Sequence, residues 1–280
     1  MTHPTFDLDR VLDGIDHLAT QRPIAARILA TAQAEDTDAK ALAGVLAADF
    51  ALAGRVMKLA NSAYFGMRGR ITSLQLAVTV VGFTTVGTMA TVALTELDDE
   101  SRLPEDFWTV STGLAVAASR LAPKFGERAA DALCLGVLAP LGSALLHQYD
   151  RAGYSALLAA EPSFAGRRRA ELARYGRTAL QLTAEALQEW GFPTVLVVPL
   201  EKVDDRSSAA GGLLRAAYEV VSRLMVAGHK PVPIATLTRG AVREEDLPEI
   251  LYEVRNEAED LRQLLIGDAA GDIPLPRPES

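Results

Sequence analysis

The sequence predicts an all-α protein, and three observations carry this prediction. Hydrophobic residues make up 49% of the 280 residues but aromatic residues only 6%, so the core must be built mainly from Ala, Leu and Val. That composition favours closely packed helices over a sheet. Apolar residues recur at three- and four-residue spacing along most of the chain, and no long alternating pattern accompanies them. The single β-like run, Val195–Leu200, is compatible with either a strand or a buried helix.

Helix-start signals divide the chain into segments. Pro23 suits the first turn of a helix, and Asp38 and Asp49 offer N-caps for the next two. Thr72 and Gln75 match a capping box, in which each side chain bonds to the backbone of the other residue. The expected helices span residues 7–18, 23–34, 38–48, 50–61, 73–81, 84–97, 105–121, 127–147, 154–160, 166–174, 178–190, 193–202, 209–226 and 245–265.

Breaks between these helices predict the domain organisation. The acidic stretch 98–104 ends in a proline and separates two strongly apolar regions, so we expect lobes at 1–98 and 105–266 joined by a linker at 99–104. Pro140 should kink or restart the helix that contains it. Residues 229–240 are expected to form a loop with an extended piece, and the tail 267–280 to be disordered.

Charge and composition exclude several classes of function. The net charge of −8 disfavours binding to nucleic acid or to an anionic membrane. The single cysteine, Cys134, cannot form an internal disulfide or a cysteine metal cluster. The N-terminus lacks an apolar signal core, and the longest apolar candidate for a membrane span, Leu74–Leu94, is interrupted by Thr, Gly and Gln. We therefore expect a cytoplasmic protein without membrane insertion.

The segment Leu42–Gly82 carries a specific pattern. Its features are an Asp before a helix, a Leu-Ala-Asn-Ser-Ala-Tyr run at 59–64, a glycine-bearing loop, and an Ile followed by a Ser before a helix that ends in Gly. This pattern resembles the signature of the HDOD family, the HD-related output domains of bacterial signalling proteins. Weaker matches extend the resemblance over about 23–218. The resemblance implies an N-terminal helical lobe packed on a degenerate HD-like helical lobe, with a role in signal output.

The resemblance also invites comparison with the related HD phosphohydrolases, which use His and Asp ligands to hold metal ions that activate water. The positions that correspond to those ligands are Val110, Ala139, Pro140, Val203 and Asp204, with a final Asp position near Tyr218. None of them is a histidine. The four histidines of the chain are far apart, and none has a second histidine at helical chelate spacing. We therefore expect no catalytic residues, no metal and no cofactor.

Two groups of residues are candidates for binding. The first is a basic run that forms either a solvated, ion-paired helix face or a site for an acidic protein, a cyclic dinucleotide or a nucleic acid. Its members are Arg167, Arg168, Arg169, Arg174 and Arg177. The second is an ordered loop that either stabilises the fold or forms a recognition surface, with its two arginines as a small anion site. Its members are Asn61, Ser62, Tyr64, Arg68 and Arg70.

The function expected from these observations is that of a non-catalytic signalling module. Because the chain leaves no room for a fused receiver domain, we expect a signalling protein as its partner in trans. Two alternatives stay open: a divergent metal-dependent phosphohydrolase of nucleotides or cyclic dinucleotides, and a regulator that binds a cyclic dinucleotide or nucleic acid through 167–177.

Overall fold

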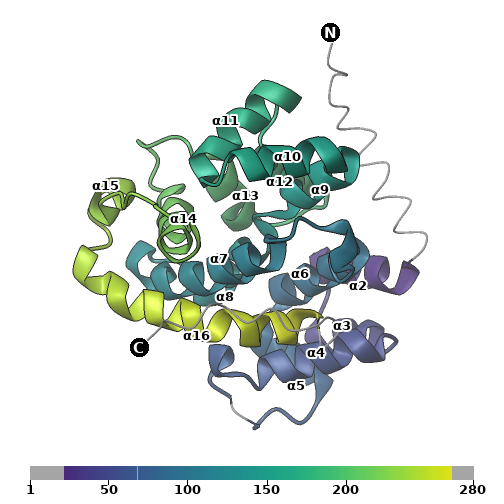
Figure 1. Ribbon diagram of the computed structural model, residues 1–280. Helices are drawn as coiled ribbons and strands as arrows, with labels where there is room; N and C mark the ends of the chain where they lie inside the picture. Colours follow the sequence, from purple (N-terminus) through teal and green to yellow (C-terminus); the bar gives the residue numbers. More distant parts are fainter. Residues whose placement is uncertain (1–21, 68, 267–280) are drawn as a thin grey trace.

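A computed structural model describes residues 22–67 and 69–266 (Figure 1). Within these ranges the chain forms helices joined by turns, without a β-strand, which confirms the predicted fold class. The expected helix at 7–18, Arg68 and the tail at 267–280 lie outside the described residues. The α-helices are α2 (Pro23–Gln33), α3 (Ala39–Leu46), α4 (Phe50–Ala60), α5 (Leu74–Val81), α6 (Phe83–Leu94), α7 (Phe107–Leu121), α8 (Ala129–Leu138), α9 (Leu141–Tyr149), α10 (Arg151–Ala160), α11 (Phe164–Tyr175), α12 (Ala179–Glu189), α13 (Thr194–Glu201), α14 (Gly212–Met225), α15 (Ile234–Thr238) and α16 (Leu247–Ile266). Four short 3₁₀ turns complete them: η1 (Ala63–Phe65), η2 (Glu100–Arg102), η3 (Ala122–Phe125) and η4 (Glu244–Asp246).

Side-chain caps mark the starts of several helices, among them α3, α4 and α5. The Asp38 and Asp49 carboxylates accept the expected capping bonds from backbone N–H groups. The capping box at Thr72 is wrong by one residue, because the Ser73 hydroxyl is the cap and accepts from the N–H of Leu76. Gln75 then stands at the second helical position, where it cannot complete the box.

Three other sequence expectations are decided by the structure. Pro140 separates α8 from α9, as predicted. The β-like run lies in α13, so the helical alternative is the right one. The prediction of a loop with an extended piece at 229–240 is wrong in part, because this segment contains the five-residue helix α15. A helix of about one turn is too short to show apolar periodicity in the sequence.

Helix α7 lies at the centre of the molecule, where it packs against α8, α14 and α16. Helix α16 crosses beneath α7 and α8 and reaches α4, so the end of the described chain returns to its beginning (Figure 1). One hydrophobic cluster runs from Ala25 to Ile266, and a smaller cluster surrounds Tyr154. The division at 98–104 therefore stays a prediction, because the main core continues across both expected lobes.

Two hydrogen bonds hold the connection between α6 and α7 in place. The Trp108 indole Nε1 donates to the carbonyl oxygen of Leu97 at 2.9 Å. His147 Nδ1 lies 3.0 Å from the carbonyl oxygen of Arg102, and the histidine side chain is buried. A carbonyl oxygen can only accept, so Nδ1 carries the hydrogen of this contact. These bonds fix the start of α7, which carries part of the site described below.

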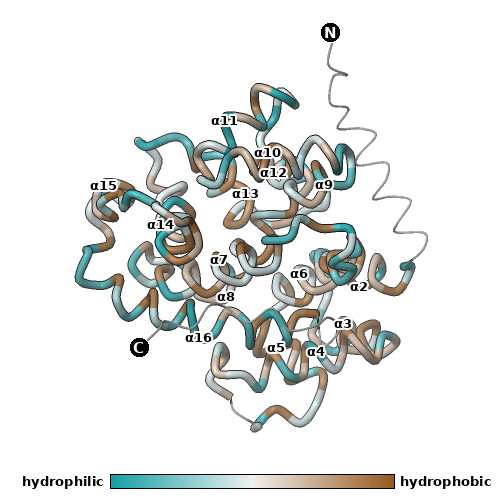
Figure 2. Tube along the Cα trace, viewed as in Figure 1, coloured by the Kyte–Doolittle hydropathy of each residue, from teal (hydrophilic) through white to brown (hydrophobic). Residues whose placement is uncertain are grey.

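The stretch Ala129–Tyr149, which contains α8 and α9, is long and apolar enough to cross a membrane by composition alone. Its most apolar window is 78% buried inside the fold. Figure 2 shows the hydrophobic positions of α7 and α8 gathered in the interior, while α11 and α16 carry many hydrophilic residues. The apolar character of this stretch is that of a core helix pair.

Candidate functional site

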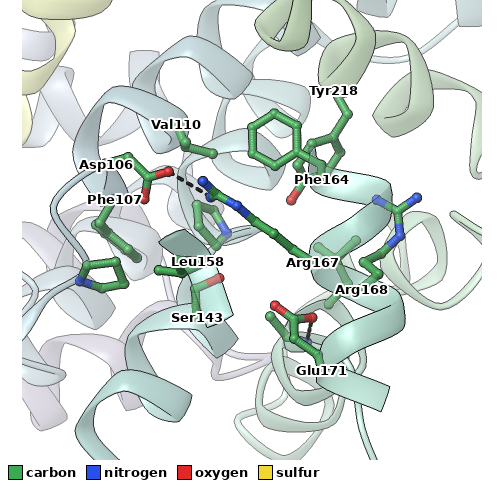
Figure 3. A pocket seen from close by; sticks show the side chains of 14 residues that line it. Asp106, Phe107, Val110, Ser143, Leu158, Phe164, Arg167, Arg168, Glu171 and Tyr218 are labelled. Atoms are coloured by element: carbon green, nitrogen blue, oxygen red, sulfur yellow. Dashed lines mark hydrogen bonds and ion pairs between the residues drawn. The ribbon is translucent and has the colours of Figure 1, made fainter. Parts of the chain in front are cut away.

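A small pocket of about 40 Å³ lies where α7, α9, α11, α12 and α14 meet (Figure 3). We call it the inner pocket. Its walls are Pro104, Asp106, Phe107, Val110, Pro140, Ser143, Leu158, Phe164, Arg167, Arg168, Glu171, Ala179, Leu180 and Tyr218. Two of these, Val110 and Pro140, are positions at which the resemblance places metal ligands of the HD hydrolases. The structure thus brings together residues that are 30 positions apart in the sequence.

An arginine side chain spans the inner pocket. Arg167 Nη1 donates to Asp106 Oδ2 at 2.7 Å, and its Nε donates to the carbonyl oxygen of Glu161 at 3.1 Å. The guanidinium carbon lies 5.4 Å from the centroid of the Phe164 ring. The Arg167 side chain is only 17% exposed, so a charge-assisted hydrogen bond there is stronger than one in open solvent. A fixed positive charge therefore lies beside Val110 (Figure 3).

Helix α11 places this arginine through a defined start. The Ser163 hydroxyl caps the helix by accepting from the N–H of Gly166 at 3.1 Å. Arg167 follows in the first turn and points toward α7, whereas Arg168 points away from Asp106 (Figure 3). The two adjacent arginines therefore face different parts of the protein.

Glu171, one turn further along α11, is buried at the opposite side of the inner pocket. Its Oε1 accepts from the Tyr154 hydroxyl at 2.8 Å, and its Oε2 accepts from the N–H of Ala179 at 2.9 Å. Burial raises the pKa of the Glu171 carboxyl above its ordinary value, although both hydrogen bonds and the two nearby arginines oppose the shift. The carboxylate joins α10, α11 and α12 around the pocket.

Tyr218 brings α14 to the pocket. Its ring packs edge-on against Phe164, with the centroids 4.9 Å apart. Figure 3 shows its hydroxyl pointing into the inner pocket, and within the described part of the chain no residue forms a hydrogen bond with that hydroxyl. Burial raises the pKa of this phenol.

A second cavity of about 230 Å³ lies on the other side of Tyr218, and we call it the outer cavity. It shares Phe164, Arg168 and Tyr218 with the inner pocket. Its remaining walls are Ser163, Ala165, Val203, Asp204, Arg206, Arg215, Glu219, Ser222, His229, Val232 and Leu237.

The five positions matched to hydrolase ligands thus have three different locations. Val110 and Pro140 line the inner pocket, and Val203 and Asp204 line the outer cavity. Ala139 is fully buried, and its carbonyl oxygen accepts from the Thr183 hydroxyl at 2.9 Å. No three His, Cys, Asp or Glu side chains of the described residues are grouped so that they could hold a metal ion.

The donor chemistry of the inner pocket does not fit a metal centre. Val110 and Pro140 have no side-chain donor, and the two carboxylates already accept hydrogen bonds from protein groups. The guanidinium of Arg167 is itself a cation, so it would repel a metal ion placed beside it.

The basic run does not form one surface. Arg167 pairs with Asp106, Arg168 with Asp204, Arg174 with Asp150 and Arg177 with Glu185, while Arg169 is exposed. For four of the five arginines, this arrangement matches the alternative of an ion-paired helix face. Arg167 lines the inner pocket, and Arg168 lines a cavity on each side of it.

The loop after α4 is held by its own side chains. The Asn61 amide donates to the carbonyl oxygens of Met57 and Ile71, and its Oδ1 accepts from the N–H of Ile71 at 3.0 Å. The Ser62 hydroxyl donates to the carbonyl oxygen of Leu59. The Tyr64 hydroxyl donates to the carbonyl oxygen of Glu257 in α16 at 3.1 Å. Arg70, in the same loop, is exposed. The hydrogen bonds of Asn61, Ser62 and Tyr64 support the alternative in which these side chains stabilise the fold.

Sequence reasoning missed Asp106 and Glu171 as members of the site. A signal for Asp106 was present, because it stands four residues before Val110 and therefore on the same face near the start of α7. Glu171 likewise stands four residues after Arg167 in α11. Only the tertiary fold shows that these two pairs face one pocket.

The model of the HDOD domain matches residues 18–205. No curated protein matches the sequence. Among solved structures, a candidate signal transduction protein from Marinobacter aquaeolei VT8 is 20% identical with a TM-score of 0.66; the match covers 87% of this chain but only 58% of that longer protein.

Two further solved structures match over nearly their whole length. A candidate phosphohydrolase from Shewanella amazonensis SB2B is 22% identical with a TM-score of 0.64, and the match covers 92% of this chain and 96% of that one. An HDOD domain protein of unknown function from Geobacter sulfurreducens is 20% identical with a TM-score of 0.60, and the match covers 87% and 90%. These likenesses show the all-α fold, and the family match spans well over half of the sequence. The chain therefore belongs to the HDOD family.

Proposed function

We propose that this protein is a non-catalytic, cytoplasmic signalling module that binds a partner protein in trans. The observation that carries the proposal is the Arg167–Asp106 ion pair inside the inner pocket. In a hydrolase of the HD type this region would hold metal ions. Here a protein cation and apolar side chains line it, so the fold is retained without the ligand chemistry.

Family membership and one of the named relatives support the signalling part of the proposal. The Marinobacter protein is named for signal transduction and shares the fold of this chain. The Shewanella protein is named as a phosphohydrolase, and it represents the alternative that the inner pocket argues against.

Catalysis is tested with purified protein. Metal content is measured by mass spectrometry, and hydrolysis of bis-p-nitrophenyl phosphate and of cyclic di-GMP is followed with and without added Mn²⁺. We expect no stoichiometric metal and no turnover above that of Arg167→Ala and of buffer. Metal-dependent turnover that chelation abolishes and Mn²⁺ restores would overturn the proposal.

Partner binding is tested by photo-crosslinking in the native host. A photoreactive amino acid replaces the exposed Arg70 in the loop after α4, and a matched control replaces the exposed Arg151 at the start of α10. We expect one dominant protein adduct at position 70 that is absent at position 151. Identical adducts at both positions would mean that the loop does not recognise a partner.

A further inference from the structure

The outer cavity carries unused positive charge. Arg168 Nε donates to Asp204 Oδ1 at 3.1 Å, but within 22–67 and 69–266 no acceptor bonds to its two terminal nitrogens. The side chain of Asp204 is 63% exposed and that of Arg168 is 22% exposed, so water screens and weakens this ion pair. Arg206 is exposed on the same cavity and forms no ion pair with a described residue. Two guanidinium groups therefore have N–H donors to offer.

The other charged groups of the outer cavity are already committed to protein partners. Glu219 is 4% exposed, and its oxygens accept from Arg223 Nε and from the N–H of Val232 and contact His229 Nε2 at 3.1 Å. The Arg215 guanidinium donates to backbone carbonyl oxygens of five residues: Lys202, Val203, Asp205, Ser208 and Leu237. The guanidinium N–H donors left for a ligand are consequently those of Arg168 and Arg206, and the exposed Asp204 is the carboxylate beside Arg168.

The rest of the outer cavity suits the organic part of a small ligand. The Phe164 and Tyr218 rings form one side, and Val203, Val232 and Leu237 add apolar surface. The volume of about 230 Å³ is far larger than a single ion needs. Val203, Asp204 and Arg206 come from the connection between α13 and α14.

We propose that the outer cavity binds a small phosphorylated molecule of about nucleoside-monophosphate size. The phosphate oxygens accept from the terminal nitrogens of Arg168 and from Arg206, because the planar guanidinium fork matches phosphate geometry. The organic part of the ligand packs against Phe164, Val232 and Leu237. This binding site shares Phe164, Arg168 and Tyr218 with the inner pocket. It does not include the loop after α4 or the Arg167–Asp106 ion pair, and it does not rest on the proposed function.

Calorimetric titration of the full chain at fixed low ionic strength tests the proposal, with inorganic phosphate, adenosine 5′-monophosphate and adenosine as probes. We expect saturable binding of one monophosphate per chain, weaker binding of phosphate, and the weakest binding of adenosine. Arg168→Gln should weaken monophosphate binding by about tenfold or more, since it removes charge-assisted hydrogen bonds. The matched control, Arg169→Gln, removes the same charge one residue away and should bind like the wild type.

Two further variants separate ligand binding from folding. Asp204→Asn removes the ion pair but keeps Arg168, so monophosphate binding should be unchanged or tighter. Arg206→Gln alters an exposed side chain and should weaken binding several-fold even if Arg168→Gln does not fold. The proposal is overturned if neither phosphate nor monophosphate binds saturably, if adenosine binds as tightly as the monophosphate, or if Arg169→Gln weakens binding as much as Arg168→Gln.

Discussion

Arg167 Nη1 lies 2.7 Å from Asp106 Oδ2, and this ion pair joins the first turn of α11 to the residue that precedes α7. The two residues are 61 positions apart. The side chains are 17% and 30% exposed, so the pair is partly withdrawn from water. Removing one partner leaves the other charge without its hydrogen bond.

Asp106→Asn should therefore lower the free energy of unfolding by about 1–2 kcal/mol. Urea denaturation followed by circular dichroism measures the change. Arg169→Gln serves as the control, because this exposed side chain should stay within about 0.5 kcal/mol of the wild type. Equal stability of Asp106→Asn and the wild type would mean that the ion pair does not hold α11 against α7.

Replacing Arg215 should strongly destabilise the protein. Its guanidinium donates hydrogen bonds to five backbone carbonyl oxygens around the outer cavity. Arg215 is 8% exposed. Arg215→Met leaves those acceptors unbonded, which should cost about 3 kcal/mol or more. Differential scanning calorimetry should show a midpoint lowered by roughly 6–12 °C. Arg206→Gln, in the same connection but exposed, should leave the midpoint nearly unchanged.

Asn61 should control the order of the loop after α4. Its side-chain amide makes three hydrogen bonds, of which two tie the end of α4 to Ile71 and one goes to the carbonyl oxygen of Met57. Asn61→Ala should destabilise this segment by about 2–3 kcal/mol, because each lost bond contributes about 1 kcal/mol. Native-state hydrogen exchange should show faster exchange at the N–H of Ile71 while the amides of α7 stay protected. Equal acceleration in α7 would instead indicate global destabilisation.

Glu171 gives a prediction for the dependence of stability on pH. Burial raises the pKa of its carboxyl above the ordinary 4.5 in the folded state. The native state then holds this proton more tightly than the unfolded state, so the contribution to stability is fully present below about pH 4.5 and is lost as the pH rises through the folded pKa.

Glu171→Gln carries a permanently neutral side chain that can still accept from the N–H of Ala179. Its stability relative to the wild type should therefore increase as the pH rises from about 4 to about 8. Urea denaturation of both proteins across this range measures the difference. A relative stability that falls with rising pH would show that the hydrogen bonds from Tyr154 and Ala179 outweigh burial.

Local signals explain which parts of the fold the sequence predicts. Asp38 and Asp49 cap helices because a carboxylate before an apolar periodic segment satisfies free backbone N–H groups. Thr72 and Ser73 offer the same chemistry one residue apart, and the structure has Ser73 as the cap. Helix boundaries of this kind are decided by packing and lie beyond the reach of local patterns.

The candidate site depends on contacts between distant segments. The positions of Val110 and Pro140 followed from family resemblance, and the structure places both at one pocket. The ion-pair partner of Arg167 could not be predicted in the same way. Asp106 is 61 positions away, and several other acidic residues lie closer to Arg167 in the sequence. Arg167 and Arg168 look equivalent in the sequence, but one turns to the inner pocket and the other to Asp204 in the outer cavity.

The proposed function requires that the guanidinium of Arg167 takes the place of metal ions in the inner pocket. Anomalous diffraction from crystals grown with excess Mn²⁺ shows whether a metal ion binds there. We expect no anomalous peak beside Val110 and Pro140, with Arg167 within hydrogen-bond distance of Asp106. A manganese ion coordinated in that pocket, with the arginine displaced, would contradict it.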